Sequence, residues 1–362
     1  MKFKPLSAVL ASAVLFGVSM PLAKLLLGGI PPVALAGLLY AGAFLGLAVY
    51  RGSAGCARRW NLTRGTAVQA PLEKHDLPWL AGAILAGGIA APILLMLGLT
   101  RVTGFAGSLL LNFEAAATAL IAVYLFRENA GRRVWTALAL MTSGGVFLSW
   151  NSAQGRLDLA GPLLILAAMS GWGLEKNLTR RISGKDPVQI AMIKGLVSGA
   201  FSLTLAFVLG KGVSPQLPVI AGLAVGALGY GLSLVLFIKG LNGLGAFRAG
   251  ALFSIAPFAG ALASVIVLGE RVRPGMAAAG LVMAAAVVLV VRENHAHAHH
   301  HDPTTHVHAH VHSDLHHDHA HEGDDREPHV HEHAHEEADH VHGHWPDDHH
   351  RHGHWSSTDR RP

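Results

Sequence analysis

Long apolar runs separated by short polar segments fill residues 1–294 of this chain. An α-helix needs roughly 20 apolar residues to cross about 30 Å of hydrocarbon, and ten of the runs approach that length. We therefore predict an all-α membrane protein with ten transmembrane helices. They lie near residues 6–27, 33–50, 77–99, 104–126, 134–150, 159–178, 188–209, 217–238, 246–268 and 274–291.

The pattern changes completely after residue 294. The last 68 residues hold 24 of the 25 histidines, mostly as His-x-His repeats with interleaved Asp and Glu. So few apolar side chains cannot form a folded core. We predict that residues 294–362 are a disordered His/Asp/Glu-rich tail.

Composition excludes several classes of protein. The chain is 51% hydrophobic and 14% charged, whereas soluble proteins average about 25% charged residues, so a soluble globular protein is excluded. The basic excess of residues 1–294 lies in short loops, where it orients membrane helices and does not indicate a nucleic-acid partner. The single cysteine, Cys56, excludes an intramolecular disulfide.

Loop charges predict the orientation of the helices. The loops after the second, fourth and sixth predicted helices carry more Lys and Arg than those on the opposite side, so both termini are expected in the cytoplasm. A multi-pass protein of a cell inner (plasma) membrane is the expected setting. The first run, after Lys2 and Lys4, also resembles a secretory signal, but the internal repeat requires it as a helix.

An internal repeat divides the predicted helices into two sets of five, residues 1–155 and 156–293. A shift of 142 residues aligns helices three to five with helices eight to ten. Since five is odd, the second copy must enter the membrane from the opposite side, an architecture typical of transporters. The residues that match under this shift are Gly98-Leu99 with Gly240-Leu241, Phe105 with Phe247, and Glu128 with Glu270.

Several short motifs carry a family resemblance across residues 6–291. They are Phe16-Gly17 with Pro21-Leu22-Ala23-Lys24, Leu109-Leu110-Leu111-Asn112-Phe113-Glu114, Phe126-Arg127-Glu128, Ala256-Pro257-Phe258 and Leu268-Gly269-Glu270. Because these motifs occur together in this order, the chain resembles an EamA-type member of the drug/metabolite transporter superfamily. The resemblance implies a ten-helix, exporter-like fold around a central cavity. It implies no single substrate, because the superfamily handles amino acids, metabolites, nucleotide sugars and drugs.

Glu114 is the most informative polar residue of the predicted helices. It lies about ten residues into the fourth one, where an ionised carboxylate costs at least about 2.5 kcal/mol. We interpret it as a substrate-binding or proton-coupling group, the alternative being a structural hydrogen bond between helices. Asn112 is a second polar candidate on the same helix.

Lys194 and Glu175 are further candidates for substrate binding or proton coupling. Lys194 either extends to the interface or pairs with Glu114 or an anionic substrate. Glu175 either contributes to the site or belongs to a local charge cluster with Lys176. The cations nearer helix ends are expected to be interfacial anchors, namely Lys24, Lys176, Lys239 and Arg248.

Three prolines predict helix breaks near this site: Pro21, Pro92 and Pro257. Each removes a backbone hydrogen bond and leaves carbonyl groups that can line a cavity. Ordinary kinks of membrane helices are the alternative reading.

The tail has the composition of a metal-binding segment. Alternate side chains of an extended chain lie on one side, so neighbouring imidazoles can share an ion. Neutral imidazole suits Zn, Ni, Co and Cu, while a passive solubilising extension is the alternative. The predicted ligands are His306, His308, His310, His312, His329, His331, His333 and His335.

These features favour a secondary transporter, most simply an exporter, that moves a small solute by alternating access. A divalent Ni, Co or Zn transporter is the first alternative, although the ten predicted helices contain no histidine or cysteine. A membrane-anchored metal buffer or sensor is the second. No nucleophile-base constellation or phosphate loop indicates an enzyme, and no cofactor is required. The expected partners are the lipid bilayer, a small-molecule substrate and divalent metal ions; a homodimer is compatible with the sequence.

Overall fold

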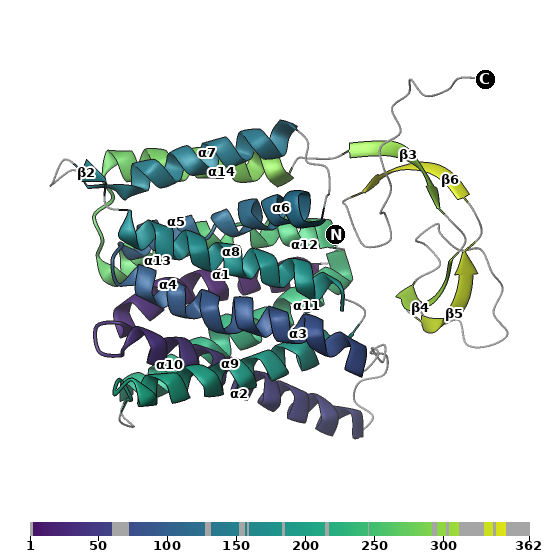
Figure 1. Cartoon of the computed structure of the whole chain (residues 1–362), viewed down its shortest axis with the longest axis horizontal. Helices are drawn as coiled ribbons and strands as arrows, with labels where there is room; N and C mark the ends of the chain where they lie inside the picture. The colour runs from purple at the N-terminus through teal and green to yellow at the C-terminus, as the bar shows by residue number, and fades with distance from the viewer. Residues whose placement is uncertain are drawn as a thin grey trace.

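A computed structural model describes most of the chain. The described residues are 3–59, 72–126, 132–151, 156–157, 159–182, 185–213, 217–244, 246–291, 295–301, 304–310, 329–335 and 338–344. Within them, the helices form one bundle, and four of the six short strands belong to the histidine-rich tail (Figure 1).

The first half of the bundle begins with two uninterrupted helices and continues with broken ones. Its elements are α1 (Phe3–Leu26), α2 (Pro32–Arg59), η1 (Lys74–Asp76), α3 (Leu77–Ala83), η2 (Ile84–Ala90), α4 (Ala91–Leu99), α5 (Gly104–Leu110), α6 (Phe113–Phe126) and α7 (Arg132–Ser149).

The second half follows a short hairpin of β1 (Trp150–Asn151) and β2 (Arg156–Leu157). It repeats the order of two continuous helices, two broken ones and a final helix. Its elements are α8 (Ala160–Arg180), α9 (Pro187–Val208), α10 (Leu217–Gly226), η3 (Ala227–Leu232), α11 (Ser233–Leu244), α12 (Ala246–Phe253), α13 (Ala256–Leu268) and α14 (Pro274–Val291).

All ten predicted ranges fall on helical structure, but the described helices differ in their ability to cross a membrane. Seven stretches are long and apolar enough by length and composition: Pro5–Leu26, Pro32–Ser53, Lys74–Leu99, Gly104–Leu125, Pro187–Val208, Leu217–Leu241 and Arg248–Leu268. Two further apolar helices, Trp135–Leu148 and Pro274–Leu289, are shorter, and α8 carries the charges of Glu175, Lys176 and Arg180. The apolar helices indicate a multi-pass membrane protein.

Proline accounts for two of the helix interruptions. Pro92 stands in the first turn of α4, directly after the π-helix η2, and Pro257 stands in the first turn of α13. A proline at these positions has no N–H to bond to the preceding turn, so the regular ladder restarts there. The break expected at Pro21 is absent, because α1 continues through it to Leu26. Removal of one N–H does not end a helix whose neighbours hold it in place.

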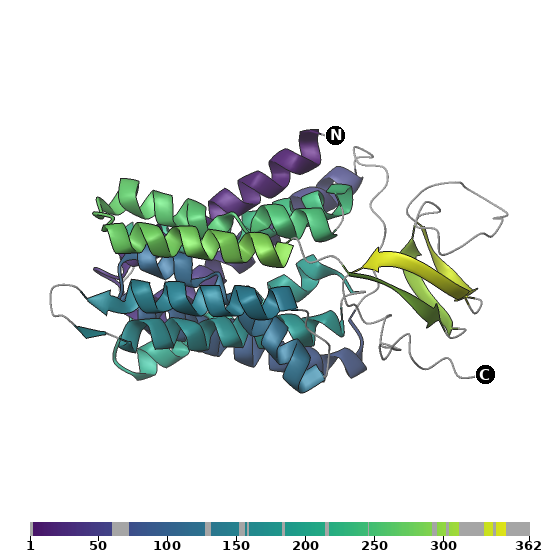
Figure 2. The ribbon, with the colours of Figure 1, turned by 90° about the horizontal axis from the view of Figure 1, so that it is seen from above.

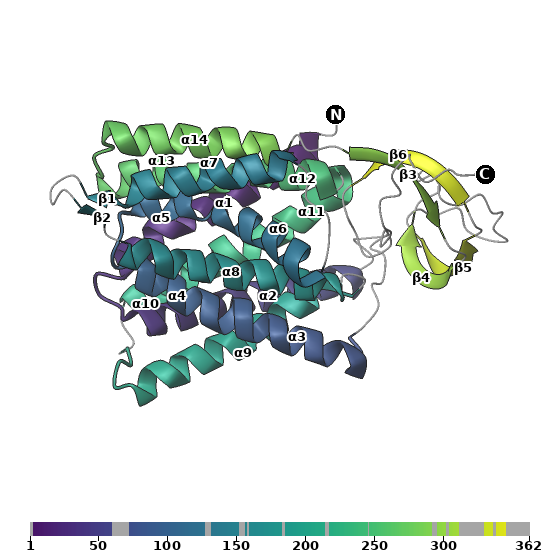
Figure 3. The same ribbon diagram turned by 45° about the horizontal axis from the view of Figure 1, so that its top comes forward.

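The first helices of the two halves run in opposite directions. α1 starts at the end of the bundle that carries the tail, whereas α8 starts at the end with the β1–β2 hairpin (Figure 1). Figure 2 shows the tail and the hairpin beyond opposite ends of the bundle. The packing also exchanges between the halves, since α1 contacts α11 and α13 while α8 contacts α4 and α6. Helices in equivalent places of the two halves also pack together, α2 with α9 and α7 with α14 (Figure 3).

Small residues allow the closest helix contacts. A Cβ at Gly17 of α1 would lie 2.2 Å from the carbonyl oxygen of Ala256, and one at Gly226 would lie 2.1 Å from that of Leu39. Such backbone approach is the main source of helix association where lipid removes the hydrophobic driving force. Glycine is therefore required at both crossings.

The tail contains paired strands where we predicted a chain without regular structure. β3 (His295–His301) pairs antiparallel with β6 (Ala338–His344), and β4 (Thr304–His310) pairs antiparallel with β5 (His329–His335). The prediction of disorder considered only the lack of a hydrophobic core. It ignored the period of two in His-x-His, which matches the alternation of side chains along a strand.

Candidate functional site

The predicted polar residues of the bundle occupy three neighbouring helices. Glu114 lies in the first turn of α6, Glu175 near the end of α8 and Lys194 in α9. Asn112 lies in the break between α5 and α6, where it is buried and its Nδ2 donates to the carbonyl of Leu109 at 2.9 Å. Asn112 therefore stabilises the break locally, whereas the charged residues connect different helices.

Glu114 pairs with a lysine that the sequence had suggested as an anchor. Its Oε1 lies 2.6 Å from Nζ of Lys176 on α8, and the side chains are 19% and 59% exposed respectively. Glu114 does not pair with Lys194, which was one of the alternatives considered for that lysine. The adjacent Glu175 and Lys176 point about 100° apart on α8, so each reaches a different neighbouring helix.

Lys194 instead pairs with Glu175. The two side chains form a hydrogen-bonded ion pair between α9 and α8 and are 23% and 15% exposed. Nζ of Lys194 also lies 5.9 Å from the centre of the Tyr40 ring, within the range of a cation–π interaction. The charges of Glu114, Lys176, Glu175 and Lys194 thus cancel in pairs.

The π-helix η2 supplies a backbone acceptor beside these pairs. The carbonyl of Gly87 accepts hydrogen bonds from the Tyr40 hydroxyl at 2.8 Å and from Nε1 of Trp172 at 2.9 Å. Single-turn π-helices displace carbonyls from the regular ladder and are frequent at functional sites. A Cβ at Gly87 would collide with the Glu175 carboxylate, so glycine leaves the room that Glu175 occupies.

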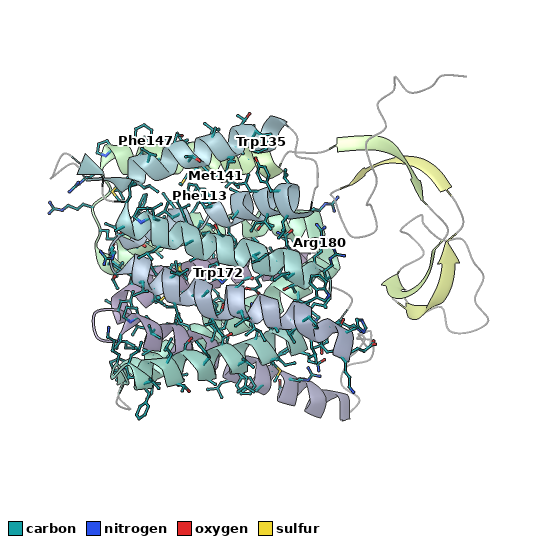
Figure 4. The ribbon with its side chains drawn as sticks, in the orientation of Figure 1. Phe113, Trp135, Met141, Phe147, Trp172 and Arg180 are labelled. Carbon is teal, nitrogen blue, oxygen red and sulfur yellow. The ribbon has the colours of Figure 1, made fainter. Side chains whose placement is uncertain are left out.

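Aromatic rings form a layer next to the charged pairs. The ring of Phe16 on α1 lies 6.4 Å from that of Trp172 and 5.6 Å from those of Tyr230 and Phe253, between centroids. Tyr230 belongs to the second π-helix, η3, and lies 5.9 Å from Tyr40. Figure 4 shows Trp172 in the middle of the bundle and Arg180 at the end toward the tail.

Further polar contacts hold α8 against α6. Nδ2 of Asn177 donates to the carbonyls of Thr118 and Gly173, at 3.2 and 2.8 Å, and the Thr118 hydroxyl donates to the carbonyl of Glu114 at 2.7 Å. On α9, the buried hydroxyl of Ser198 has no hydrogen-bond partner among the described residues. It is one turn from Lys194 and leaves an unsatisfied polar atom beside the site.

The carboxylate of Glu270 joins the end of α13 to the start of α5 at the end of the bundle away from the tail. Gly269, at φ 65°, ends α13 in the left-handed conformation. The next residue, Glu270, accepts hydrogen bonds from the N–H groups of Gly104 (2.6 Å) and Phe105 (2.8 Å) at the start of α5. Nearby, Nζ of Lys24 donates to the carbonyl of Leu99 at 2.5 Å, so Lys24 binds backbone and is not a simple anchor.

An ionic latch at the tail end joins two loops; we define it as Glu73, Asp76 and Lys185. Nζ of Lys185 donates to Oε1 of Glu73 at 2.7 Å and lies 3.3 Å from Oδ2 of Asp76. The hydrogen bond from Lys185 lowers the pKa of Glu73, and the same bond raises the pKa of Lys185. His75 contacts both acids, at 3.5 Å from Glu73 and 3.2 Å from Asp76.

The bundle and the tail differ in the metal ligands that they offer. Among the side chains that the structure describes, which do not include those of the tail, no group of three or more His, Cys, Asp or Glu could hold an ion. Of the predicted ligands, His312 lies outside the described residues. The others occupy two paired strands: His306, His308 and His310 in β4, and His329, His331, His333 and His335 in β5.

The family comparison agrees with the second half of this bundle. Residues 159–292 match the model of the EamA-like transporter family. This stretch is similar to an EamA-like domain. The matched stretch contains Glu175, Lys176 and Lys194, while Glu114 lies in the first half, outside the match.

Two proteins and one solved structure resemble a larger part of the chain. An uncharacterized transporter of Methanothermobacter thermautotrophicus is 26% identical over 290 residues, covering 78% of this chain and 84% of that protein. An uncharacterized protein of Pseudomonas aeruginosa is 31% identical over 192 residues, 51% of this chain and 64% of that protein. A crystal structure with 18% identity and a TM-score of 0.56 covers 78% of this chain and 96% of its own, which shows a common fold beyond the matched stretch.

The sequence alone could not find the whole site. Lys176 was set aside because it lies near the end of a predicted helix, and Tyr40 and Trp172 gave no polar signal inside apolar runs. A usable hint was the adjacency of Trp172, Glu175, Lys176 and Asn177 within one helix, since four hydrogen-bonding side chains in two turns are unusual in a membrane span.

Proposed function

We propose that the chain is a secondary transporter that moves a small polar or charged solute across the membrane by alternating access, in the direction of export. The observation that carries the proposal is the pair of ion pairs, Glu114–Lys176 and Glu175–Lys194, held among apolar helices from two oppositely directed halves. The match to the EamA-like transporter family and the similarity to an uncharacterized transporter support it.

The register of the helix interruptions supports an inverted repeat. The shift of 142 residues carries η2 (Ile84–Ala90) onto residues 226–232, which contain η3 (Ala227–Leu232). The same shift carries the α5–α6 break at residues 111–112 to within one residue of the α12–α13 break at 254–255. Two halves that share their irregularities and run in opposite directions can exchange conformations, which opens a site between them to each face in turn.

The charged pairs suggest how a solute is bound and released. A buried ion pair that loses one partner leaves an uncompensated charge, at a cost of about 3–5 kcal/mol. A solute charge or a proton that replaces one partner removes this cost, so binding at the pairs changes which helices are joined. We propose Glu175 and Glu114 as the groups that accept a solute cation or a coupling proton, and Lys194 as the group that accepts an anionic solute group.

We place the protein in a cell inner membrane with ten spans and both termini in the cytoplasm. The start of α1 and the tail lie at the same end of the bundle, as an even number of spans requires (Figure 1). The same end carries the cations Arg51, in the last part of α2, and Lys185, between α8 and α9, in agreement with an excess of positive charge on the cytoplasmic side.

We propose that the histidine-rich tail binds divalent transition-metal ions as an accessory to the transporter. The composition of residues 295–362 favours this second role. Metal as the transported solute remains the alternative, with the carboxylates of Glu114 and Glu175 as the oxygen ligands of the path.

Flux through purified protein in liposomes tests the proposal. The protein is reconstituted with and without residues 295–362 and offered radiolabelled amino acids, organic acids, amines and zinc. We expect saturable flux of one organic solute class that survives removal of the tail and is lost in E175Q and E114Q, while K239Q on α11 retains it. Tail-independent zinc flux would make metal the solute. Absence of flux for every solute would contradict the transporter.

A further inference from the structure

The two strand pairs of the tail share one register. In both pairs, β3 with β6 and β4 with β5, the residue numbers of opposite partners add up to the same total. The β4–β5 pair therefore continues the register of the β3–β6 pair, with no residue inserted or missing on either side. Residues 295–310 run antiparallel to residues 329–344 wherever the structure describes them.

Histidines stand opposite histidines in this register. In β4–β5, His306 is opposite His333, His308 opposite His331 and His310 opposite His329. In β3–β6 the opposite partners are His295 with His344, His297 with His342, and His299 with His340. Each pair of strands thus carries three His–His positions, one at every second residue. We call the three of β4–β5 the inner ladder and the three of β3–β6 the outer ladder.

The positions between the histidine pairs carry mostly small or apolar residues. They include Val307 opposite Glu332, Ala309 opposite Val330, Ala296 opposite Gly343, and Ala298 opposite Val341. Because residues i and i+2 of a strand lie on one face, the three histidine pairs of a ladder belong to one face and the intervening residues to the other. The His-x-His repeat is thus a two-faced strand pattern and not only an accumulation of histidine.

The spacing of one ladder suits a four-coordinate ion. Directly opposite Cβ atoms of an antiparallel pair are about 4.5–5.5 Å apart, and positions i and i+2 of one strand are about 6.6–6.8 Å apart. Two adjacent pairs therefore place four histidine positions at the corners of a small rectangle on one face. Histidine nitrogen binds Zn²⁺ at about 2.0–2.1 Å, and the ion takes four ligands in most protein sites.

We propose that each ladder is a separate metal site, formed by histidines that are opposite each other across two strands and not by neighbours within one repeat. This deepens the metal-binding role proposed for the tail and rests on it. The outer ladder adds six ligands that the sequence had not singled out: His295, His297, His299, His340, His342 and His344. Binding of Zn²⁺ would stabilise the strand pairing, because an ion that binds only the paired form shifts the equilibrium toward it.

A double-mutant cycle on the full-length protein in detergent tests the register. Zn²⁺ affinity is measured by competition with a chromophoric chelator for H308N, H331N, H342N and the doubles H308N/H331N and H308N/H342N. H308N and H331N remove opposite partners from the inner ladder, so each should weaken one class of site by about tenfold or more and the double should add little. H342N belongs to the outer ladder, so H308N/H342N should weaken both classes independently.

The outcomes decide between the ladders and a diffuse tail. Equal, additive effects of every histidine, whatever its register partner, would overturn the proposal, as would absence of tail-dependent Zn²⁺ binding. A matched control exchanges Val330 and Ala334 (V330A/A334V), which keeps composition and histidine register and should leave affinity unchanged. This test measures Zn²⁺ binding alone. Absence of solute flux, together with the expected non-additivity of H308N and H331N, would contradict the transporter and not the ladders.

Discussion

Nζ of Lys176 lies 2.6 Å from Oε1 of Glu114 and joins α8 to α6. The preceding residue, Glu175, joins the same helix to α9 through Lys194. Two consecutive residues of α8 therefore connect this helix to α6 of the first half and to α9 of its own half. Any change of charge at one pair alters how α8 is held, which is why we regard α8 as the centre of the proposed transport site.

The first prediction concerns the Glu114–Lys176 pair. E114K leaves two cations facing each other and should reduce flux by about tenfold or more, because neither cation then has an opposite charge beside it. The reversed double variant, E114K/K176E, restores opposite charges and should recover a measurable part of the flux. Flux is compared at equal amounts of reconstituted protein, with K239Q as the unaffected control. If the double variant is no better than E114K alone, the pair does not act as a unit.

The second prediction concerns the contact of α1 with α13. G17A places a methyl group 2.2 Å from the carbonyl oxygen of Ala256, so the two helices must separate. We expect a loss of about 1–3 kcal/mol of unfolding free energy, measured by denaturation in mixed detergent micelles. Gly250 is the matched control, because it is an exposed helical glycine with nothing within 4 Å of a Cβ. G250A should be neutral or stabilise by up to about 1 kcal/mol; equal losses in both variants would contradict the close contact.

The sequence predicted the positions of the helices well but not their interruptions. The length of an apolar run indicates how many residues can lie in lipid, and all ten predicted ranges fall on helix. Whether a run contains a π-helix, as at Ile84–Ala90, depends on backbone bonding and on neighbours such as Tyr40 and Trp172 that occupy the freed carbonyl. This information belongs to the tertiary structure. Pro21 illustrates the converse, because its local break signal is overridden within α1.

The third prediction concerns Glu270. Its carboxylate accepts two backbone N–H groups at the start of α5, so E270A leaves both without their partner. Loss of a helix cap costs about 0.5–2 kcal/mol, and we expect E270A to lower unfolding free energy within this range. R271A changes the exposed neighbour and should have little effect. A variant E270A as stable as R271A would show that water replaces the cap fully.

The fourth prediction concerns acid and the ionic latch. Lys185 holds the pKa of Glu73 below its ordinary value of 4.5. The contribution of this carboxylate to the latch is therefore complete above pH 4.5 and is lost as the pH falls through the lowered pKa. Trp79, near Arg181 at the same end of the bundle, can report it by fluorescence in a variant that retains only this tryptophan.

The matched variant for the latch is K185M. Without the ammonium group the pKa of Glu73 should return toward its ordinary value, so the acid transition of Trp79 emission should move to higher pH. E73Q should reduce the amplitude of the transition in both backgrounds. An unchanged midpoint in K185M would show that Lys185 does not hold the latch.

The polar site was predictable only in part, and for a physical reason. Burial of charge in an apolar run identified Glu114, Glu175 and Lys194, because the cost of an ion in lipid does not depend on the fold. Their partners were left open by the sequence, since which cation meets which carboxylate depends on the rotation of α8 about its axis. For the tail, the lack of a core predicted disorder, and the period of two in His-x-His, which is compatible with strands, was not used to predict them.

The account depends most on two halves that face opposite ways in the membrane. Gly29 in the α1–α2 loop and Arg181 in the α8–α9 loop occupy equivalent places in the two halves, and both are exposed. After C56S removes the native thiol, G29C and R181C are labelled in sealed vesicles with a membrane-impermeant maleimide. We predict that the two positions react from opposite sides of the membrane, with position 181 on the side of the tail. Labelling of both from the same side would contradict the inverted repeat and the transport mechanism built on it.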